Sequence, residues 1–368
     1  MPAPESILKM RILIASGASG GHIFPALALM DNLKVSGASV LLVLPRKSKY
    51  SGIPVECADL EYITAAVLDF SLSSSNLSGA CSFLKGAWEG LRIMMKFHPD
   101  VVVGFGSLHT VALLFWAWLF RIKTVIHEQN VIPGKANRLI AKFADSLALS
   151  FPQTRSYLSG SREKVVLTGN PIRKELIRLD KKEALNFFKF EEGKFNILIT
   201  GGSQGSHKIN AVSFAALTAL SRKEDLQIIH ISGVQDFAGL KAGYAGSGMT
   251  HKLFDFFPAM QYAYSAADLV ICRAGATTIA ELQKFSLPAV LVPYPYAGAH
   301  QAGNARVLED IGAAEVILDA DLAVEKLKDK LQEFFSDAGK LRLMRQAYQK
   351  LPVLNAAEML AKIVLTLG

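Results

Sequence analysis

Two glycine-rich turns constrain the fold of this chain more than any other feature. One spans residues 17–21 (Gly-Ala-Ser-Gly-Gly), and the other spans residues 201–205 (Gly-Gly-Ser-Gln-Gly). Each follows a short apolar run and opens an apolar helical pattern. A strand, a glycine turn and a helix bring backbone N–H groups to one point, which suits an anion such as a sugar diphosphate. Two such units about 180 residues apart predict two Rossmann-like halves that face each other across a cleft.

Neither turn matches the dinucleotide-binding fingerprint. That pattern is G-x-G-x-x-G with an acidic residue about 20 positions later. The first turn is instead G-x-x-G-G, and residues 41–47 carry no acidic side chain. The sequence therefore disfavours a nicotinamide-dependent enzyme.

Composition narrows the class of protein further. A chain of 368 residues, with 51% hydrophobic and 20% charged residues, suits two folded domains. A net charge of +8 favours anionic partners, either a nucleotide diphosphate or anionic lipid, but no basic cluster indicates nucleic-acid binding. Cys57, Cys81 and Cys272 lack zinc or disulfide spacing. No signal core precedes Met10, so we expect a cytoplasmic protein.

Apolar runs rich in β-branched residues alternate with helical patterns along most of the chain. This alternation predicts parallel sheets with helices on both faces. Expected strands are 11–15, 40–44, 101–103, 124–126, 146–149, 165–167, 196–200, 227–231, 269–271 and 289–292. We expect one doubly wound domain at 1–170, with a final helix in 353–368 packing back on it, and a second at 171–352. Serine-rich residues 71–79 predict a loop.

In the C-terminal half, polar residues follow the expected strand at 269–271. Arg273 and Thr278 come directly after it, and Glu281 lies in the helix that follows. Free N–H groups and a threonine hydroxyl suit a pyrophosphate, which Arg273 would stabilise as it departs. Glu281 would accept both hydroxyls of a ribose, and the less favoured alternative is a solvated helix face.

Two amides open a later helix. Gln301 and Asn304 are three residues apart on one face, after a loop with two prolines. Amides both donate and accept hydrogen bonds, so they suit neutral sugar hydroxyls, although turn and cap roles are the commoner use of such residues. The pair Asp319 and Asp321 precedes a helix and is interpreted as capping. We expect no metal site and no cofactor.

In the N-terminal half, four polar residues end the strand at 124–126. They are His127, Glu128, Gln129 and Asn130, with Asn137 shortly after. Such a run lines a site or ties loops together, and a buried structural pair of His127 and Glu128 is equally open. His22 lies on the first glycine turn at a helix start, which favours a neutral imidazole able to accept a proton.

These motifs together resemble the MurG family of N-acetylglucosaminyltransferases, which complete lipid II in peptidoglycan synthesis. The resemblance covers nearly the whole chain and follows the order of the family's motifs. The motifs are 20–28, 127–130, 169–173, 201–205 with Asn210, 273–281 and 300–305.

The resemblance implies a GT-B fold and an inverting displacement that needs one base and no protein nucleophile. The donor, UDP-N-acetylglucosamine, would bind mainly to the C-terminal domain, and the acceptor, undecaprenyl-diphospho-N-acetylmuramoyl-pentapeptide, to the N-terminal one. His22 becomes the leading candidate base and Glu128 a second catalytic candidate. The implied binding residues are Ser203, Gln204 and Arg173 at the diphosphate, Glu281 at the ribose, Gln301 and Asn304 at the sugar, backbone near Phe257 at uracil, Ser19 and Asn130 on the acceptor side, and Asn137 beside the donor or the acceptor. Further substrate-binding candidates are Gly20, Gly21, Asn210, Arg273 and Thr278.

The chain departs from the family's pattern at two turns. Ala18 stands where a glycine is usual, and the third glycine loop, 104–109, lacks the usual tyrosine. His109 would replace that tyrosine or cap the following helix. Two other functions therefore stay open, a transferase for another lipid such as diacylglycerol and an inactive sugar-nucleotide or lipid-binding protein.

Two apolar segments flanked by cations suggest a membrane-facing surface. One is 83–97, with Lys85, Arg92 and Lys96, and the other is 111–120, followed by Arg121 and Lys123. Apolar and basic residues together suit an anionic lipid surface. We favour docking for 83–97 and a core helix for 111–119. The resemblance implies a peripheral protein on the cytoplasmic face of the inner membrane, with cell-wall synthesis proteins as possible partners.

Overall fold

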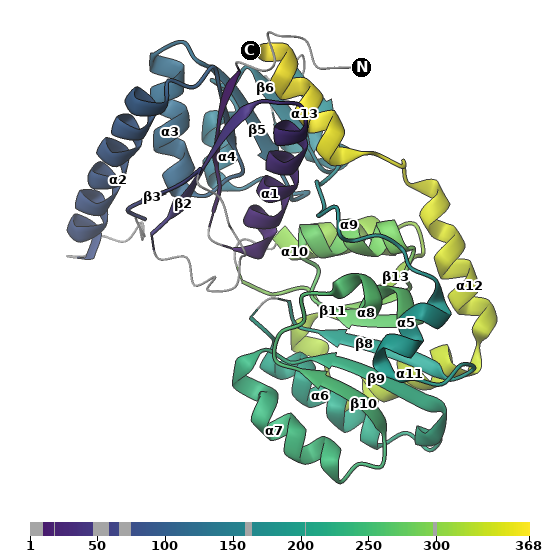
Figure 1. The fold of residues 1–368 in the computed structure, drawn as a ribbon. Helices are drawn as coiled ribbons and strands as arrows, with labels where there is room; N and C mark the ends of the chain where they lie inside the picture. The colour runs from purple at the N-terminus through teal and green to yellow at the C-terminus, as the bar shows by residue number, and fades with distance from the viewer. Residues whose placement is uncertain are drawn as a thin grey trace. The chain divides into compact units, whose positions relative to one another are not determined.

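The computed structural model describes residues 10–17, 19–46, 59–65, 75–158, 164–202, 204–296 and 300–368. The chain divides into two compact units (Figure 1). Unit 1 comprises residues 1–173 and 354–368, and unit 2 comprises residues 174–353. Unit 1 is therefore discontinuous in sequence.

Unit 1 contains a parallel sheet with the strand order β3-β2-β1-β4-β5-β6-β7. The strands are β1 (Arg11–Ala15), β2 (Ser39–Pro45), β3 (Leu60–Ile63), β4 (Val101–Gly104), β5 (Lys123–Glu128), β6 (Ser146–Leu149) and β7 (Val165–Leu167). The helices are α1 (Gly20–Val35), α2 (Ser75–Phe97), α3 (Leu108–Leu119), α4 (Lys135–Ile140) and α13 (Ala356–Leu367).

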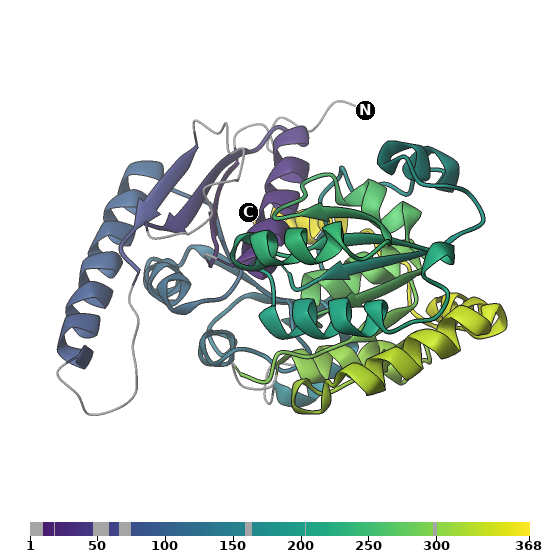
Figure 2. The ribbon, with the colours of Figure 1, turned by 90° about the horizontal axis from the view of Figure 1, so that it is seen from below.

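Both faces of this sheet are covered by helices, as its continuous apolar strands require. Ile12 and Ile14 pack with α1 and α13 in one core, whereas Leu13 and Ala15 pack with α2, α3 and α4 in another. Helix α13 lies beside α1 on this face (Figures 1 and 2). It completes the core that contains β1, to which it contributes Leu360, Ala361 and Val364.

Unit 2 contains a second parallel sheet with the strand order β10-β9-β8-β11-β12-β13. The strands are β8 (Phe195–Thr200), β9 (Leu226–Ile231), β10 (Thr250–Phe254), β11 (Leu269–Cys272), β12 (Ala289–Leu291) and β13 (Ala314–Val316). The helices are α5 (Lys181–Phe188), α6 (His207–Thr218), α7 (Val234–Ala245), α8 (Met260–Ala266), α9 (Ala276–Phe285), α10 (His300–Glu309), α11 (Val324–Ser336) and α12 (Ala338–Ala347). The two doubly wound sheets confirm the expected fold class.

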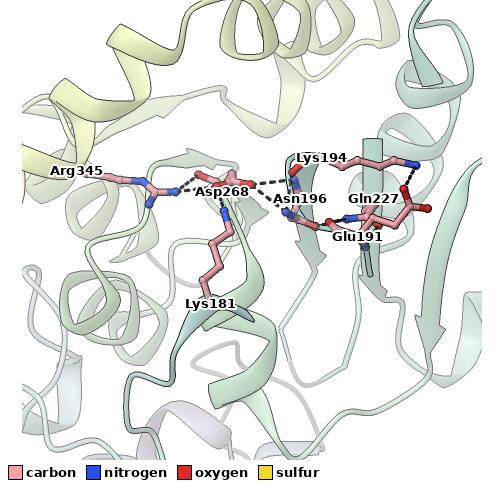
Figure 3. A network of polar contacts seen from close by, with 7 residues as sticks. All are labelled: Lys181, Glu191, Lys194, Asn196, Gln227, Asp268 and Arg345. Atoms are coloured by element: carbon pink, nitrogen blue, oxygen red, sulfur yellow. Dashed lines mark hydrogen bonds and ion pairs between the residues drawn. The ribbon is translucent and has the colours of Figure 1, made fainter. Parts of the chain in front are cut away.

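A polar network ties the amino ends of the strands of unit 2 to two helices (Figure 3). Asp268, just before β11, accepts hydrogen bonds from the backbone and the side chain of Asn196 at 3.0 and 3.1 Å. It also pairs with Lys181 of α5 at 2.5 Å and Arg345 of α12 at 3.1 Å. The network stabilises the amino end of the sheet, and ligands of open α/β sheets bind at the opposite, carboxyl end.

The structure corrects three expectations about local structure. The loop expected at 71–79 is wrong from Ser75 onward, because α2 begins there. Strands β3, β10 and β13 were not among those expected. Helix α3 is not simply a core helix, since Leu113 and Leu114 are buried while Phe115, Trp118 and Leu119 are about half exposed. Of the helices in the described residues, none is both long and apolar enough to cross a membrane.

Candidate active site

His22 occupies the first turn of α1, next to the carboxyl ends of β1 and β4. Its Nδ1 atom lies 2.7 Å from the hydroxyl oxygen of Ser19. Gly106, in the loop after β4, has φ +83°, and a Cβ built there would lie 3.3 Å from His22 Nε2 and 3.5 Å from Asn137 Nδ2. The glycine therefore leaves room for the imidazole and the Asn137 amide to approach the same point. The structure thus brings together three of the predicted site residues, Ser19, His22 and Asn137.

Glu128 is buried and surrounded by donors. Its carboxylate accepts hydrogen bonds from the backbone N–H groups of Asn130 at 2.9 Å and Gly134 at 3.0 Å, and from Asn137 Nδ2 at 2.8 Å. Burial raises the pKa of Glu128, and these donors oppose the rise. Contacts of this kind hold the loop between β5 and α4 in place. Because the Glu128 oxygens are engaged in these hydrogen bonds, His22 is the better candidate for the group that exchanges a proton with substrate.

His127 and Gln129 form a second buried group behind this loop. His127 Nε2 donates to the Gly169 carbonyl at 3.0 Å, and His127 Nδ1 lies 3.2 Å from Gln129 Nε2. Gln129 Nε2 also lies 3.2 Å from the carbonyl oxygen of Phe105. Burial lowers the pKa of His127 to about 4. The expected structural pair of His127 with Glu128 is replaced by a neutral histidine that links β5 to the chain after β7.

His109 neither caps α3 nor extends from the loop. Its side chain is buried, Nε2 lies 2.8 Å from the Ser16 carbonyl oxygen and Nδ1 lies 3.1 Å from Ser107 Oγ. Burial lowers its pKa, so the ring is neutral. The capping role is therefore wrong, because Nε2 joins the third glycine loop to the residue before the first turn and Nδ1 contacts a hydroxyl of its own loop. A role of His109 in place of the tyrosine stays a prediction.

In unit 2, the second glycine turn lies between the carboxyl end of β8 and the start of α6. Gly205 has φ +77°, and a Cβ there would overlap the Ser232 carbonyl oxygen at the end of β9. The turn is therefore packed directly against the β9–α7 connection. This close approach directs the N-terminus of α6 to the carboxyl edge of the sheet, where anions are favoured.

Asn210 lies in a buried network that supports this turn rather than on an open surface. Its Nδ2 donates to the Ser232 carbonyl at 2.8 Å and to Asp236 at 2.7 Å, and its Oδ1 lies 3.1 Å from His230 Nε2. Asp236 also contacts His207 at 2.8 Å. Burial lowers the pKa of His230 to about 3. These contacts favour a supporting role for Asn210.

Arg273 is engaged by three parts of unit 2. Its guanidinium donates to Asp319 at 2.5 Å, to Ser206 Oγ at 2.8 Å and to the Val292 carbonyl at 3.1 Å. Asp319 begins a short 3-10 helix, and α11 starts only at Val324, so the capping interpretation of Asp319 is wrong. The pair instead connects β11, β12 and the residue that precedes α6. A contact between Arg273 and a diphosphate stays a prediction.

Glu281 is buried on α9, which excludes the solvated helix face. Its Oε2 accepts a hydrogen bond of 2.7 Å from the Tyr264 hydroxyl of α8, whose side chain is also buried. Thr278, one turn earlier on α9, is half-buried. Tyr264 could not be predicted as its partner, because the contact with Glu281 arises only when α8 packs beside α9.

The two amides of α10 contact the turn after β11. Gln301 Oε1 accepts from the backbone N–H groups of Ala274 at 3.1 Å and Tyr294 at 3.0 Å. Asn304 is fully buried, and its Nδ2 donates to the Ala274 carbonyl at 3.1 Å. Both amides therefore shape the turn between Arg273 and Thr278, and sugar contacts by either remain a prediction.

The remaining predicted residues are distributed between the two units. Arg173 lies in unit 1 with its guanidinium 4.4 Å from the centre of the Phe24 ring. Gln204 is exposed on the second glycine turn, while Ser203 lies outside the described residues, as does Ala18. Phe257 is buried among aromatic rings that include Phe188 and Phe254.

Residues 12–149 match the glycosyltransferase family 28 N-terminal domain and residues 196–360 its C-terminal domain. A structure of MurG from Acinetobacter baumannii has a TM-score of 0.76 and 28% identity, covering 97% of this chain and 99% of that one. The glycotransferase of kitacinnamycin shares the fold, with a TM-score of 0.70 and 15% identity over 98% of this chain and 99% of that one. Fold and domains together define a glycosyltransferase of the GT-B class.

Curated relatives identify the family. A UDP-N-acetylglucosamine--N-acetylmuramyl-(pentapeptide) pyrophosphoryl-undecaprenol N-acetylglucosamine transferase from Halothermothrix orenii is 37% identical, with 93% of this chain and 95% of the relative covered. A protein of the same description from Thermodesulfovibrio yellowstonii is 38% identical, with 92% and 93% covered. The chain belongs to this family of N-acetylglucosamine transferases, as its motifs led us to expect.

Proposed function

We propose that this enzyme transfers N-acetylglucosamine from UDP-N-acetylglucosamine to undecaprenyl-diphospho-N-acetylmuramoyl-pentapeptide. The observation that carries the proposal is the match of both domains, over nearly their whole length, to relatives described by that one activity. The turns that carry His22 and Gln204 follow β1 and β8, at the edges where open α/β sheets bind ligands, and this supports the proposal.

His22 serves as the general base in this proposal. A hydrogen bond from Nδ1 to the Ser19 hydroxyl would orient the ring and leave Nε2 to accept the proton of the attacking sugar hydroxyl. That hydroxyl oxygen forms the new bond to the anomeric carbon while the bond from this carbon to the diphosphate oxygen breaks. The displacement inverts the anomeric centre and releases UDP, and it requires no covalent enzyme intermediate.

The donor would bind at the carboxyl edge of the second sheet. N–H groups of the turn at 201–205 and the N-terminus of α6 would stabilise the departing diphosphate, with Ser203 and Gln204 as further contacts. Glu281 would accept from the ribose, and the NH2 group of Gln301 would donate to the sugar, since its carbonyl oxygen is already used. Backbone near Phe257 would contact uracil.

We also propose that unit 1 docks on an anionic membrane surface at the cytoplasmic face of the inner membrane. Leu84, Trp88 and Met95 are 67%, 63% and 62% exposed on α2. The exposed cations Lys85, Arg92 and Lys96 belong to the same helix. Met94 of the expected docking segment is buried and takes no part. Apolar side chains among cations support attraction to a membrane that carries the lipid acceptor.

A turnover assay with the purified full chain tests the function. UDP-N-acetylglucosamine is offered with a lipid-linked muramoyl-pentapeptide, and in parallel with diacylglycerol. Product from the first acceptor alone supports the proposal. Product from diacylglycerol alone would establish the alternative transferase, and donor binding without either product would establish an inactive binding protein.

A further inference from the structure

A buried tyrosine holds the carboxylate that we assign to the ribose. The Tyr264 hydroxyl donates to Glu281 Oε2 at 2.7 Å, and both side chains are buried. The tyrosine ring is itself fixed, with its centre 5.2 Å from that of Phe285 at the end of α9. The hydroxyl therefore approaches the carboxylate from a defined direction.

The hydrogen bond from the Tyr264 hydroxyl constrains the orientation of the Glu281 carboxylate. The terminal torsion of a glutamate side chain is broad, with no strong rotamer preference of its own. A donor fixed on one oxygen selects one rotation of the carboxylate plane. An ionised carboxylate has about four acceptor sites, so the tyrosine bond is compatible with further bonds from a diol. Bonds to a charged acceptor are directional and strong, and their strength depends on that rotation.

We propose that Tyr264 is a positioning residue that orients the Glu281 carboxylate and thereby sets selectivity for a ribonucleotide over a 2′-deoxyribonucleotide. The inference rests on the proposed role of Glu281 in donor binding. It adds a residue that touches no substrate and acts only through the carboxylate. Its effect must therefore disappear when Glu281 is absent.

The experiment measures the affinities of the full-length protein for UDP and 2′-deoxy-UDP by calorimetry. We expect the wild type to prefer UDP by about tenfold or more, the range of one hydrogen bond to a charged group. In Tyr264→Phe, affinity for UDP falls about three- to tenfold, affinity for 2′-deoxy-UDP falls less, and the preference shrinks toward one. Glu281→Ala removes the preference. In the double variant Tyr264→Phe/Glu281→Ala, the tyrosine change has no further effect.

Tyr348→Phe is the matched control in the same unit. The Tyr348 hydroxyl is also buried and donates to the Leu287 carbonyl at 2.7 Å, so this variant loses an equivalent bond elsewhere. It should lower the melting temperature and leave the nucleotide preference unchanged. Melting curves of all variants verify that each is folded, and Tyr264→Phe changes the side chain by one oxygen only.

The outcomes separate the inference from the function on which it rests. Equal binding of the two nucleotides by the wild type, or a preference that survives Glu281→Ala, would remove Glu281 from the ribose site. A preference lost in Glu281→Ala but kept in Tyr264→Phe would overturn the positioning role alone. An equal loss of affinity for both nucleotides in Tyr264→Phe would show a structural role instead.

Discussion

The Nδ1 atom of His22 lies 2.7 Å from the hydroxyl oxygen of Ser19, three residues earlier on the first glycine turn. The contact joins the His22 side chain, in the first turn of α1, to the side chain of Ser19, the residue that precedes this helix. Such a bond restrains the rotation of the imidazole, and Nε2 can accept a proton in the tautomer whose Nδ1–H donates to the hydroxyl.

His22→Ala should lower turnover by about 10²- to 10⁴-fold and leave UDP affinity nearly unchanged, because a general base acts on the acceptor hydroxyl. Ser19→Ala should lower turnover less, since the base remains but its orientation is freer. Steady-state rates with the lipid acceptor and calorimetry with UDP measure the two effects. Near-normal turnover of purified His22→Ala would refute the role.

Separating Arg273 from Asp319 should destabilise unit 2. Their side chains are 12% and 18% exposed, so each substitution leaves a charge with little access to water. We expect Arg273→Ala and Asp319→Ala each to cost about 2–4 kcal/mol of unfolding free energy, and the double variant to cost less than their sum. Denaturation followed by circular dichroism provides the values. Strict additivity would mean that the pair contributes no coupling.

The buried His127 should make the stability of unit 1 depend on pH. Its pKa in the folded chain is about 4, against an ordinary value of 6.5, so the unfolded chain binds the proton first as the pH falls. The stabilising contribution is full above pH 6.5 and is lost progressively down to about pH 4. The loss amounts to roughly 3 kcal/mol.

His127→Gln keeps a donor for the Gly169 carbonyl and does not titrate, so its stability should fall less between pH 7 and pH 5 than that of the wild type. All three tryptophans, Trp88, Trp116 and Trp118, belong to unit 1, and their fluorescence in urea titrations reports its unfolding. Identical pH dependence in the two proteins would exclude His127 as the cause.

Reversing three charges on α2 should weaken binding to anionic vesicles. For Lys85→Glu/Arg92→Glu/Lys96→Glu, the vesicle partition coefficient measured by sedimentation should fall about a hundredfold, because each cation contributes roughly 1 kcal/mol of binding free energy. Binding of the wild type should also weaken in high salt. The control Lys182→Glu/Lys241→Glu/Lys326→Glu makes the same change in net charge on exposed lysines of unit 2. Equal binding by both triple variants would place the docking surface elsewhere.

Strands in the middle of each sheet were predictable because both of their faces are buried. Runs such as Ile12–Ile14 are apolar at every position, and this pattern identifies a central parallel strand. The edge strands β3 and β10 carry polar residues such as the half-buried Glu61 and the exposed Thr250, so their sequences resemble loops. Helix α2 begins among serines that predict a turn.

The candidate site shows the same division between local and tertiary information. Residues on glycine turns were found because the turns are local patterns. The hydrogen-bond partners of such residues were not found. Tyr264 contacts Glu281, Asp319 contacts Arg273, and Ser16 contacts His109, and tertiary packing alone brings each pair together. Sequence reasoning therefore identifies groups with suitable chemistry and misses the contacts that commit some of them to support.

The return of α13 to the first sheet affects how the protein is made. Leu360, Ala361 and Val364 belong to the core that contains Ile12 and Ile14 of β1, yet they follow the whole of unit 2 in the chain and are translated after it. A nascent chain that ends at Arg173 lacks one wall of this core, and unit 2 must be synthesised before that wall arrives. The part of unit 1 that is translated before unit 2 therefore completes its core only after unit 2 has been made, and removal of α13 would expose apolar surface along β1.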